Sequence, residues 1–174
     1  MAIIDFNLML IGFMGTGKST VAAKLREMLQ VEQIEMDALI AEEAGMSIPD
    51  IFDKFGEAHF RDLETEMLRK FQEKKPVVVS CGGGAVLRDE NIEIMKGQGK
   101  IILLTATPQT IYERVKETND RPVLNGNMNV EYISELMEKR RTRYEKAADI
   151  VIATDAKTVD EICNEILDLI GVNE

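Results

Sequence analysis

The sequence has little cysteine, no long apolar run and fewer basic than acidic residues. Its two cysteines, Cys81 and Cys163, are too few for a disulfide framework and too far apart for metal-ligand spacing, so we expect small buried side chains. No apolar run is long enough to cross a bilayer, and residues 1–7 lack the basic and apolar regions of a signal peptide. These absences predict a cytoplasmic protein.

The charge balance excludes two classes of partner. The chain carries 31 acidic and 21 basic residues, a formal net charge of −10. Nucleic acids and anionic membranes select basic surfaces, so we expect neither as a partner. A chain of 174 residues without repeats or low-complexity segments is most simply one domain over residues 1–174, and we expect a monomer.

One segment carries a specific chemical signal. Residues 12–19 match G-x-x-x-x-G-K-[ST] between an apolar run and a helical pattern, the context in which this motif binds phosphate. The glycines let backbone N–H groups converge on an anion, and the following helix directs its positive end to the same point. Lys18 is expected to reach the β and γ phosphates, and the Ser19 hydroxyl to ligate magnesium. The expected nucleotide contacts here are Gly12, Met14, Gly15, Thr16, Gly17, Lys18, Ser19 and Thr20.

The rest of the chain alternates apolar runs with helical patterns. Strands are predicted at 8–11, 31–36, 77–81, 100–104 and 149–153. Helices are predicted at 20–29, 38–44, 48–55, 57–73, 89–97, 108–117, 130–147 and 159–170. This alternation predicts an α/β protein, a three-layer αβα sandwich with a five-stranded parallel sheet and right-handed crossovers. The phosphate loop then lies at the carboxyl end of the first strand, where open parallel sheets bind ligands.

Two carboxylates follow the second predicted strand. Glu35 and Asp37 lie two residues apart near the phosphate loop, so one carboxylate can serve magnesium and the other an acceptor hydroxyl. The structural alternative is that Asp37 caps the next helix and Glu35 is only solvated.

Arginine and glycine mark a second region. Arg61 and Glu64 are three residues apart on a predicted helix, so the carboxylate can orient the guanidinium for a bidentate grip on a carboxylate ligand. A surface ion pair is the alternative. Gly82, Gly83 and Gly84 end the third predicted strand, which favours backbone placed close to a ligand over a loose connector.

The longest irregular stretch predicts a lid over about residues 116–127. Arg121 lies inside it, where it can reach a transferring phosphoryl group. The helix that follows carries Arg140 in a basic cluster, which is either a solvated face or one wall of the cleft.

Together these motifs resemble the shikimate kinase family over essentially the whole chain. The resemblance rests on six motifs in order, which are the phosphate loop, acid-x-Asp at Glu35, G-E-x-x-F-R-x-x-E over 56–64, the triple glycine, R-P-V-L over 121–124 and R-x-x-x-Y with Ala-Asp over 140–149. It implies a fold like that of P-loop NTPases and nucleoside monophosphate kinases, with a substrate-binding helical segment at about 37–64. It also implies transfer of the γ-phosphoryl group of ATP, with Mg²⁺, to the 3-hydroxyl of shikimate on the route to chorismate.

The resemblance implies a role for each matching residue on the acceptor side. Shikimate would lie against the triple glycine and the Phe52 and Phe60 rings. Asp37 would hold its hydroxyls and act as the base. Arg61, oriented by Glu64, and Arg140 would grip its carboxylate.

On the nucleotide side, Lys18 and Arg121 would steady the phosphates. Together with Asp37, the base, they would be the catalytic residues. Ser19 would hold magnesium with Glu35, directly or through water, and Glu35 stands where the family usually has aspartate. Arg114 would flank adenine, together with a loop at 154–158 that lacks the proline often seen there. The residues expected from that loop are Thr154 and Asp155.

Two other readings of the chain are open at this point. The first is another P-loop small-molecule kinase, acting on gluconate or a nucleoside monophosphate; a pair of arginines suited to one carboxylate favours an acidic polyol over a nucleobase. The second is a GTP-dependent switch or regulatory ATP-binding module, which is disfavoured because the sequence has no [NT]-K-x-D segment for reading guanine.

Overall fold

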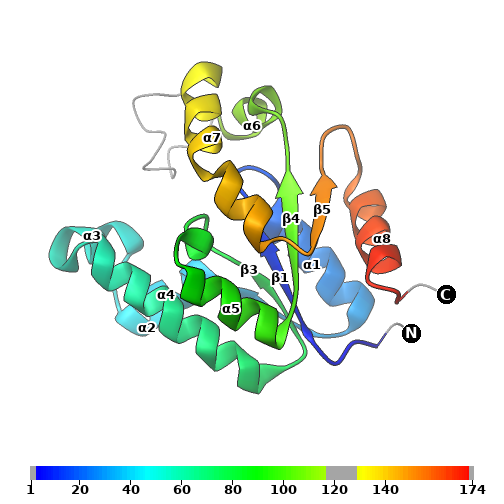
Figure 1. The fold of residues 1–174 in the computed structure, drawn as a ribbon, viewed down its shortest axis with the longest axis horizontal. Coiled ribbons are helices and arrows are strands. Elements are labelled where there is room, and N and C mark those ends of the chain that lie inside the picture. Colours follow the sequence, from blue (N-terminus) through cyan, green and yellow to red (C-terminus); the bar gives the residue numbers. More distant parts are fainter. Residues whose placement is uncertain (1–2, 117–128, 173–174) are drawn as a thin grey trace.

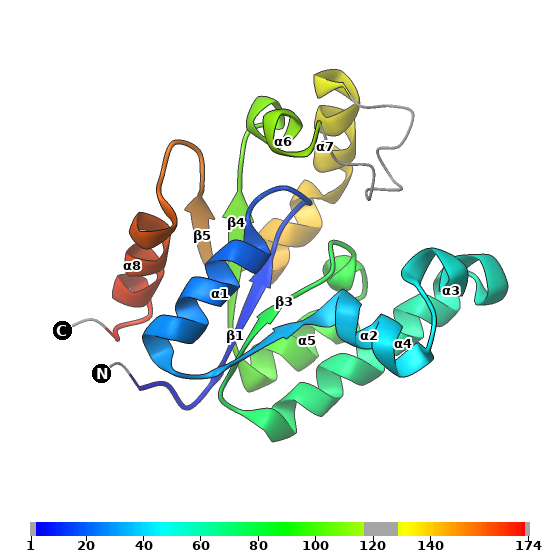
Figure 2. The ribbon, with the colours of Figure 1, turned by 180° about the vertical axis from the view of Figure 1, so that it is seen from behind.

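The computed structural model describes residues 3–116 and 129–172 of the chain. Within these residues, five parallel strands form one sheet in the order β2-β3-β1-β4-β5, and helices cover both of its faces (Figures 1 and 2). The strands are β1 (Asn7–Ile11), β2 (Glu32–Glu35), β3 (Val77–Ser80), β4 (Gly99–Thr105) and β5 (Ile150–Ala153). The predicted αβα sandwich is confirmed, and the strands lie close to their predicted bounds.

The helices also follow the predicted pattern. They are α1 (Lys18–Leu29), α2 (Met36–Ala44), α3 (Ile48–Phe55), α4 (Glu57–Phe71), α5 (Asp89–Gln98), α6 (Pro108–Val115), α7 (Val130–Ala147) and α8 (Val159–Leu169), with short 3₁₀ turns η1 (Gln72–Lys74) and η2 (Ala85–Leu87). Among these residues, no helix has the length and apolar character needed to span a membrane.

Capping side chains set the first residues of two helices. The Ser47 hydroxyl accepts a hydrogen bond from the Asp50 N–H, and the Thr107 hydroxyl accepts one from Thr110, so both caps hold the first turn of their helices. The alternative that Asp37 only caps the next helix is wrong, because Glu35 occupies the cap position and Asp37 lies in the first turn of α2. The carboxylate of Asp37 lies beside Gly82, at the end of β3.

The central strands β1 and β3 are buried on both faces, as expected for parallel strands between helices. Along β1, Leu8 and Leu10 join one apolar cluster with α1 and α8, while Met9 and Ile11 join the other with α4, α5 and α7. The views in Figures 1 and 2 show α1 and α8 on one side of the sheet and α4 and α5 on the other. Both cysteines are buried and unpaired with each other, as predicted.

The strand order places the binding edge. From β1 the chain passes to β2 and β3 on one side of the sheet and to β4 and β5 on the other, so the connections diverge at β1. Such a switch point opens a crevice at the carboxyl ends of the strands. The phosphate loop follows β1 and the triple glycine follows β3, and these two strands are direct neighbours with Leu10 opposite Ser80.

A buried amide holds the opposite end of the sheet together. Asn7 Nδ2 donates to the Phe71 carbonyl at 3.1 Å and to Gln98 Oε1 at 2.7 Å, and its Oδ1 accepts from the Val77 N–H at 3.0 Å. Gln98 in turn donates to the Leu68 carbonyl. The Asn7 side chain, which is 0% exposed, thus joins α4, β3 and α5 at the start of β1.

We expect Asn7→Ala to lower the free energy of unfolding by about 2–4 kcal/mol, because it leaves several buried polar groups without partners. Urea unfolding of the purified protein measures this loss. The exposed Asn164→Ala on α8 is the control and should change stability by less than about 0.5 kcal/mol. An equal loss in both variants would contradict a structural role for the Asn7 amide.

Candidate active site

The phosphate loop has the conformation that its glycines predict. Gly12, Gly15 and Gly17 have φ values of +146°, +79° and +98°, which side chains rarely adopt. A side chain at Gly12 would also collide with the Leu104 carbonyl, and a Cβ at Gly15 would lie 2.9 Å from Val115 Cγ1. Helix α1 begins directly after Gly17, so its free N–H groups face the loop.

The side chains of the loop are ordered around it. Lys18 Nζ donates to the carbonyls of Gly12 at 2.7 Å and Phe13 at 3.1 Å, which places the ammonium group over the loop. The Thr16 hydroxyl donates to the Phe13 carbonyl at 2.8 Å. Met14 is half-buried against the core, and Thr20 is exposed in the first turn of α1.

A pair of oxygen donors lies beside the loop. The Ser19 hydroxyl donates to Glu35 Oε2 at 2.9 Å and lies 3.5 Å from the Ser80 hydroxyl. Hydroxyl and carboxylate oxygens are the donors Mg²⁺ accepts, and Mg²⁺ usually takes only one or two from the protein alongside water and phosphate oxygens. In the described residues, no group of three or more His, Cys, Asp or Glu could hold a metal ion.

One residue of this corner was missed by the sequence analysis. Gln33 Nε2 donates to Glu35 Oε1 at 2.7 Å, and so fixes the carboxylate that faces Ser19. The two residues lie on the same face of β2 because they are two positions apart in a strand. That spacing was the available signal, but glutamine in an edge strand is commonly a solvated residue.

The triple glycine brings three acceptor-side residues together. A Cβ at Gly82 would lie 2.5 Å from Asp37 Oδ1, and a Cβ at Gly83 would lie 3.1 Å from Arg140 Nη1.

At Gly84 a Cβ would overlap the Arg61 guanidinium. Side chains from α2, α7 and α4 therefore each pack against one glycine of a single turn. The turn is closely packed, so the alternative of a loose connector is wrong.

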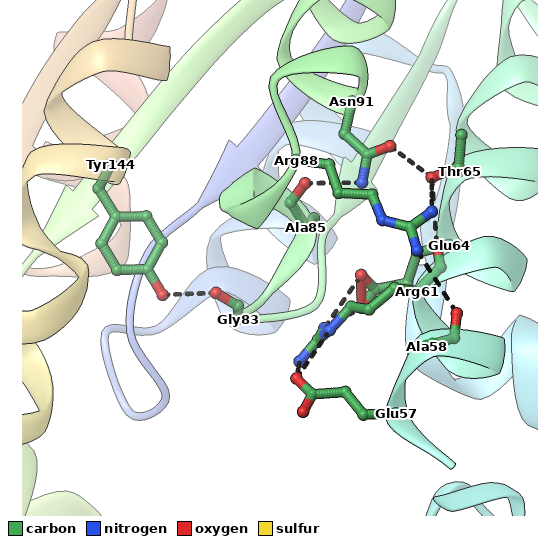
Figure 3. A network of polar contacts seen from close by, with 10 residues as sticks. All are labelled: Glu57, Ala58, Arg61, Glu64, Thr65, Gly83, Ala85, Arg88, Asn91 and Tyr144. Atoms are coloured by element: carbon green, nitrogen blue, oxygen red, sulfur yellow. Dashed lines mark hydrogen bonds and ion pairs between the residues drawn. The ribbon is translucent and has the colours of Figure 1, made fainter. Parts of the chain in front are cut away.

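Arg61 is held in one orientation (Figure 3). Its Nη1 donates to both oxygens of Glu64, at 2.7 and 3.1 Å, and its Nε and Nη2 approach Glu57 Oε1 at 3.4 and 3.3 Å. The guanidinium also lies 5.3 Å from the centre of the Phe60 ring. The Arg61 side chain is 13% exposed and that of Glu64 is 0% exposed, so the surface ion pair considered from sequence is wrong.

The buried carboxyl of Glu64 is influenced by three charged side chains. Burial raises the pKa of its carboxyl to about 7, against the opposing effect of Arg61, while Asp37 raises the pKa and Arg140 lowers it. The Phe60 ring lies against Arg61, and the Phe52 ring of α3 lies next to it, with the two ring centres 4.9 Å apart.

The loop after β5 is tied to the phosphate loop. Arg114 of α6 donates to the Gly15 carbonyl at 2.9 Å and to the Thr154 hydroxyl and carbonyl at 3.1 and 3.3 Å. Asp155 Oδ1 accepts from the Thr107 N–H at 3.0 Å, and its hydrogen bonds to Thr110 and Thr107 hold the pKa of the carboxyl below its usual range. Thr154 is buried, so adenine contacts by these residues stay a prediction. Arg121 and residues 117–127 of the predicted lid lie outside the described residues.

Comparison with known proteins identifies the family. The family model described as shikimate kinase matches residues 14–171. The chain belongs to the shikimate kinase family. A shikimate kinase from Thermodesulfovibrio yellowstonii is 44% identical over 161 residues, which cover 92% of each chain.

Solved structures of shikimate kinases agree with this assignment. The enzyme from Acinetobacter baumannii, solved in complex with shikimate, has a TM-score of 0.88 at 32% identity and covers 95% of this chain and 92% of its own. The enzyme from Aquifex aeolicus has a TM-score of 0.81 at 38% identity, over 94% and 95% of the two chains. The resemblance drawn from the sequence motifs and the P-loop kinase fold are thus both confirmed.

The buried Glu64 predicts a pH-dependent stability term. The pKa of this carboxyl is 4.5 in the unfolded chain and about 7 in the folded protein. Between these values the folded state binds more protons than the unfolded state, so the free energy of unfolding falls as the pH rises through this range. Glu64→Gln removes this titration. We therefore expect the free energy of unfolding of the variant, relative to that of the original protein, to rise by about 2–3 kcal/mol as the pH is raised from about 5 to about 7.5. Urea unfolding at a series of pH values measures this change.

The matched control is Glu66→Gln, an exposed position on the same helix. A difference between Glu64→Gln and the original protein that does not change with pH would show that Glu64 keeps one charge state over this interval.

Proposed function

We propose that this chain transfers the γ-phosphoryl group of ATP to the 3-hydroxyl of shikimate, giving shikimate 3-phosphate and ADP. The observation that carries the proposal is the packing of Asp37, Arg61 and Arg140 against one glycine turn, on the strand next to that of the phosphate loop. A donor and an acceptor bound at these two places would meet at the carboxyl edge of the sheet. The family assignment and the relative solved with shikimate support the same acceptor.

On the acceptor side, charge complementarity selects the ligand. Arg61 and Arg140 supply two guanidinium groups suited to one planar carboxylate. The carboxylate of Asp37, which is exposed on α2, would accept hydrogen bonds from the ring hydroxyls and take the proton of the attacking one. Phosphoryl transfer needs little covalent help, so the work of these residues is mainly positioning and charge neutralisation.

On the donor side, the phosphate loop and Lys18 would hold the β and γ phosphates. The oxygens of Ser19 and Glu35 suit a magnesium ion, which when bound would neutralise charge on those phosphates. We propose from the sequence that Arg121, on the predicted lid, adds positive charge at the transferring group. We also expect the enzyme to act as a cytoplasmic monomer.

Substrate choice tests the proposal against its rival. In a coupled assay of ADP release, we expect turnover with shikimate and at least about a hundredfold lower kcat/KM with gluconate or nucleoside monophosphates, which leave the two guanidinium groups unpaired or misplaced. Turnover with either rival acceptor and none with shikimate would refute the assignment.

Arg61→Ala should weaken shikimate binding by roughly 2–3 kcal/mol through loss of charge-assisted hydrogen bonds, and leave ADP binding within about twofold. Calorimetric titration with each ligand separately measures both. Arg61→Lys keeps the charge without the bidentate fork and guards against effects of an unpaired Glu64. Arg69→Ala, an exposed arginine on the same helix, is the control. Equal weakening of both ligands by Arg61→Ala would count against the clamp.

A further inference from the structure

The glycine turn is held by hydrogen bonds from two buried side chains (Figure 3). The Tyr144 hydroxyl donates to the Gly83 carbonyl at 2.7 Å, and Asn91 Nδ2 donates to the Ala85 carbonyl at 3.0 Å. Tyr144 is 5% exposed and Asn91 is 0% exposed. The carbonyls of Gly83 and Ala85, on either side of Gly84, therefore accept hydrogen bonds from side chains that are shielded from water.

The bond from Asn91 leads to the helix of Arg61. Asn91 Oδ1 accepts from the Thr65 hydroxyl at 2.6 Å. A hydroxyl has one hydrogen to donate, and the contact with Asn91 is shorter than the one with the Arg61 carbonyl at 3.1 Å. Thr65 lies on α4 four residues after Arg61, which places it one turn along the same face. The chain of bonds thus runs from α4 through Asn91 to the turn.

The bond from Tyr144 leads to the helix of Arg140 in the same way. Tyr144 lies on α7 four residues after Arg140, again one turn along the same face. Figure 3 shows α4 and α7 on opposite sides of the turn, with Tyr144 reaching it from one side and Thr65 and Asn91 from the other. Each arginine helix is therefore bonded to the turn one helical turn past its arginine.

These bonds matter because both arginines approach the turn closely. A Cβ at Gly83 would lie 3.1 Å from Arg140 Nη1, and one at Gly84 would overlap the Arg61 guanidinium. A small shift of either helix relative to the turn would change the separation of the two guanidinium groups. Binding of one carboxylate by both arginines depends on that separation, and misplacement by about 1 Å can cost roughly a hundredfold in rate.

We propose that Thr65, Asn91 and Tyr144 are positioning residues that hold Arg61 and Arg140 at a fixed separation by bonding both helices to the same turn. The inference rests on the proposed function, since it concerns how the shikimate carboxylate is received. None of the three residues is needed to touch the substrate. Their effect is on acceptor binding and leaves the nucleotide loop unchanged.

The test uses variants that remove one hydroxyl each. Thr65→Val removes the hydroxyl at nearly constant volume, while Thr65→Ser keeps it. Tyr144→Phe removes the other hydroxyl. Its control is Tyr132→Phe on the same helix, because the structure gives the Tyr132 hydroxyl no hydrogen bond among the described residues.

In steady-state assays, Thr65→Val and Tyr144→Phe should each raise the KM for shikimate about three- to tenfold, the effect of one lost neutral hydrogen bond, with the KM for ATP within about twofold. Thr65→Ser and Tyr132→Phe should keep both KM values. An unchanged KM for shikimate in both variants, a parallel rise of the two KM values, or an equal effect of Thr65→Ser and Thr65→Val would overturn the proposal.

A second measurement separates this proposal from the proposed function. Without any substrate, the two variants should shift the NMR amide signals of Gly82, Gly83 and Gly84 and the Nε signals of Arg61 and Arg140, whereas Tyr132→Phe should not. If the original protein fails to phosphorylate shikimate, the function is wrong and these signals still decide the positioning role. Glycine and arginine signals that do not move would overturn it.

Discussion

The proposed site depends on three consecutive positions at which a side chain would displace a charged group. After β3, a Cβ at Gly82 or Gly84 would intrude on Asp37 or Arg61, and one at Gly83 would press on Arg140. Glycine is entropically costly to order, and the cost is tolerated here because three helices can then bring charged groups to one turn. The parallel sheet supplies the rest, because it places this turn beside the phosphate loop at the same edge.

The electrostatics of the site oppose those of the whole molecule. A chain with a net charge of −10 must collect cations where two anionic ligands would meet. One of these cations, Arg61, is held in place by two carboxylate partners, of which Glu64 is fully buried and Glu57 is exposed. The buried partner is destabilised as an anion, since burial raises its pKa to about 7. Stability is thus given up to fix the direction of one guanidinium group.

Sequence reasoning worked where the signal is local. Strand and helix patterns and the phosphate loop follow from residues a few positions apart. It failed where a residue acts through distant contacts. The capping role considered for Asp37 was wrong because β2 ends and α2 begins without an intervening loop, so the helix starts earlier than the pattern suggested.

Two buried asparagines that support the fold and the glycine turn could not be recognised from the sequence for the same reason. Asn7 and Asn91 are both 0% exposed, and each amide donates to one element while accepting from another, which an apolar side chain of the same size cannot do. Asn7 joins elements at the amino end of the sheet, and Asn91 joins α4 to the glycine turn. In the sequence, Asn7 is a single amide beside the apolar run of β1, and Asn91 follows three charged residues at the start of α5. Their different tasks follow only from which edge of the sheet they lie on, and that is a property of the fold.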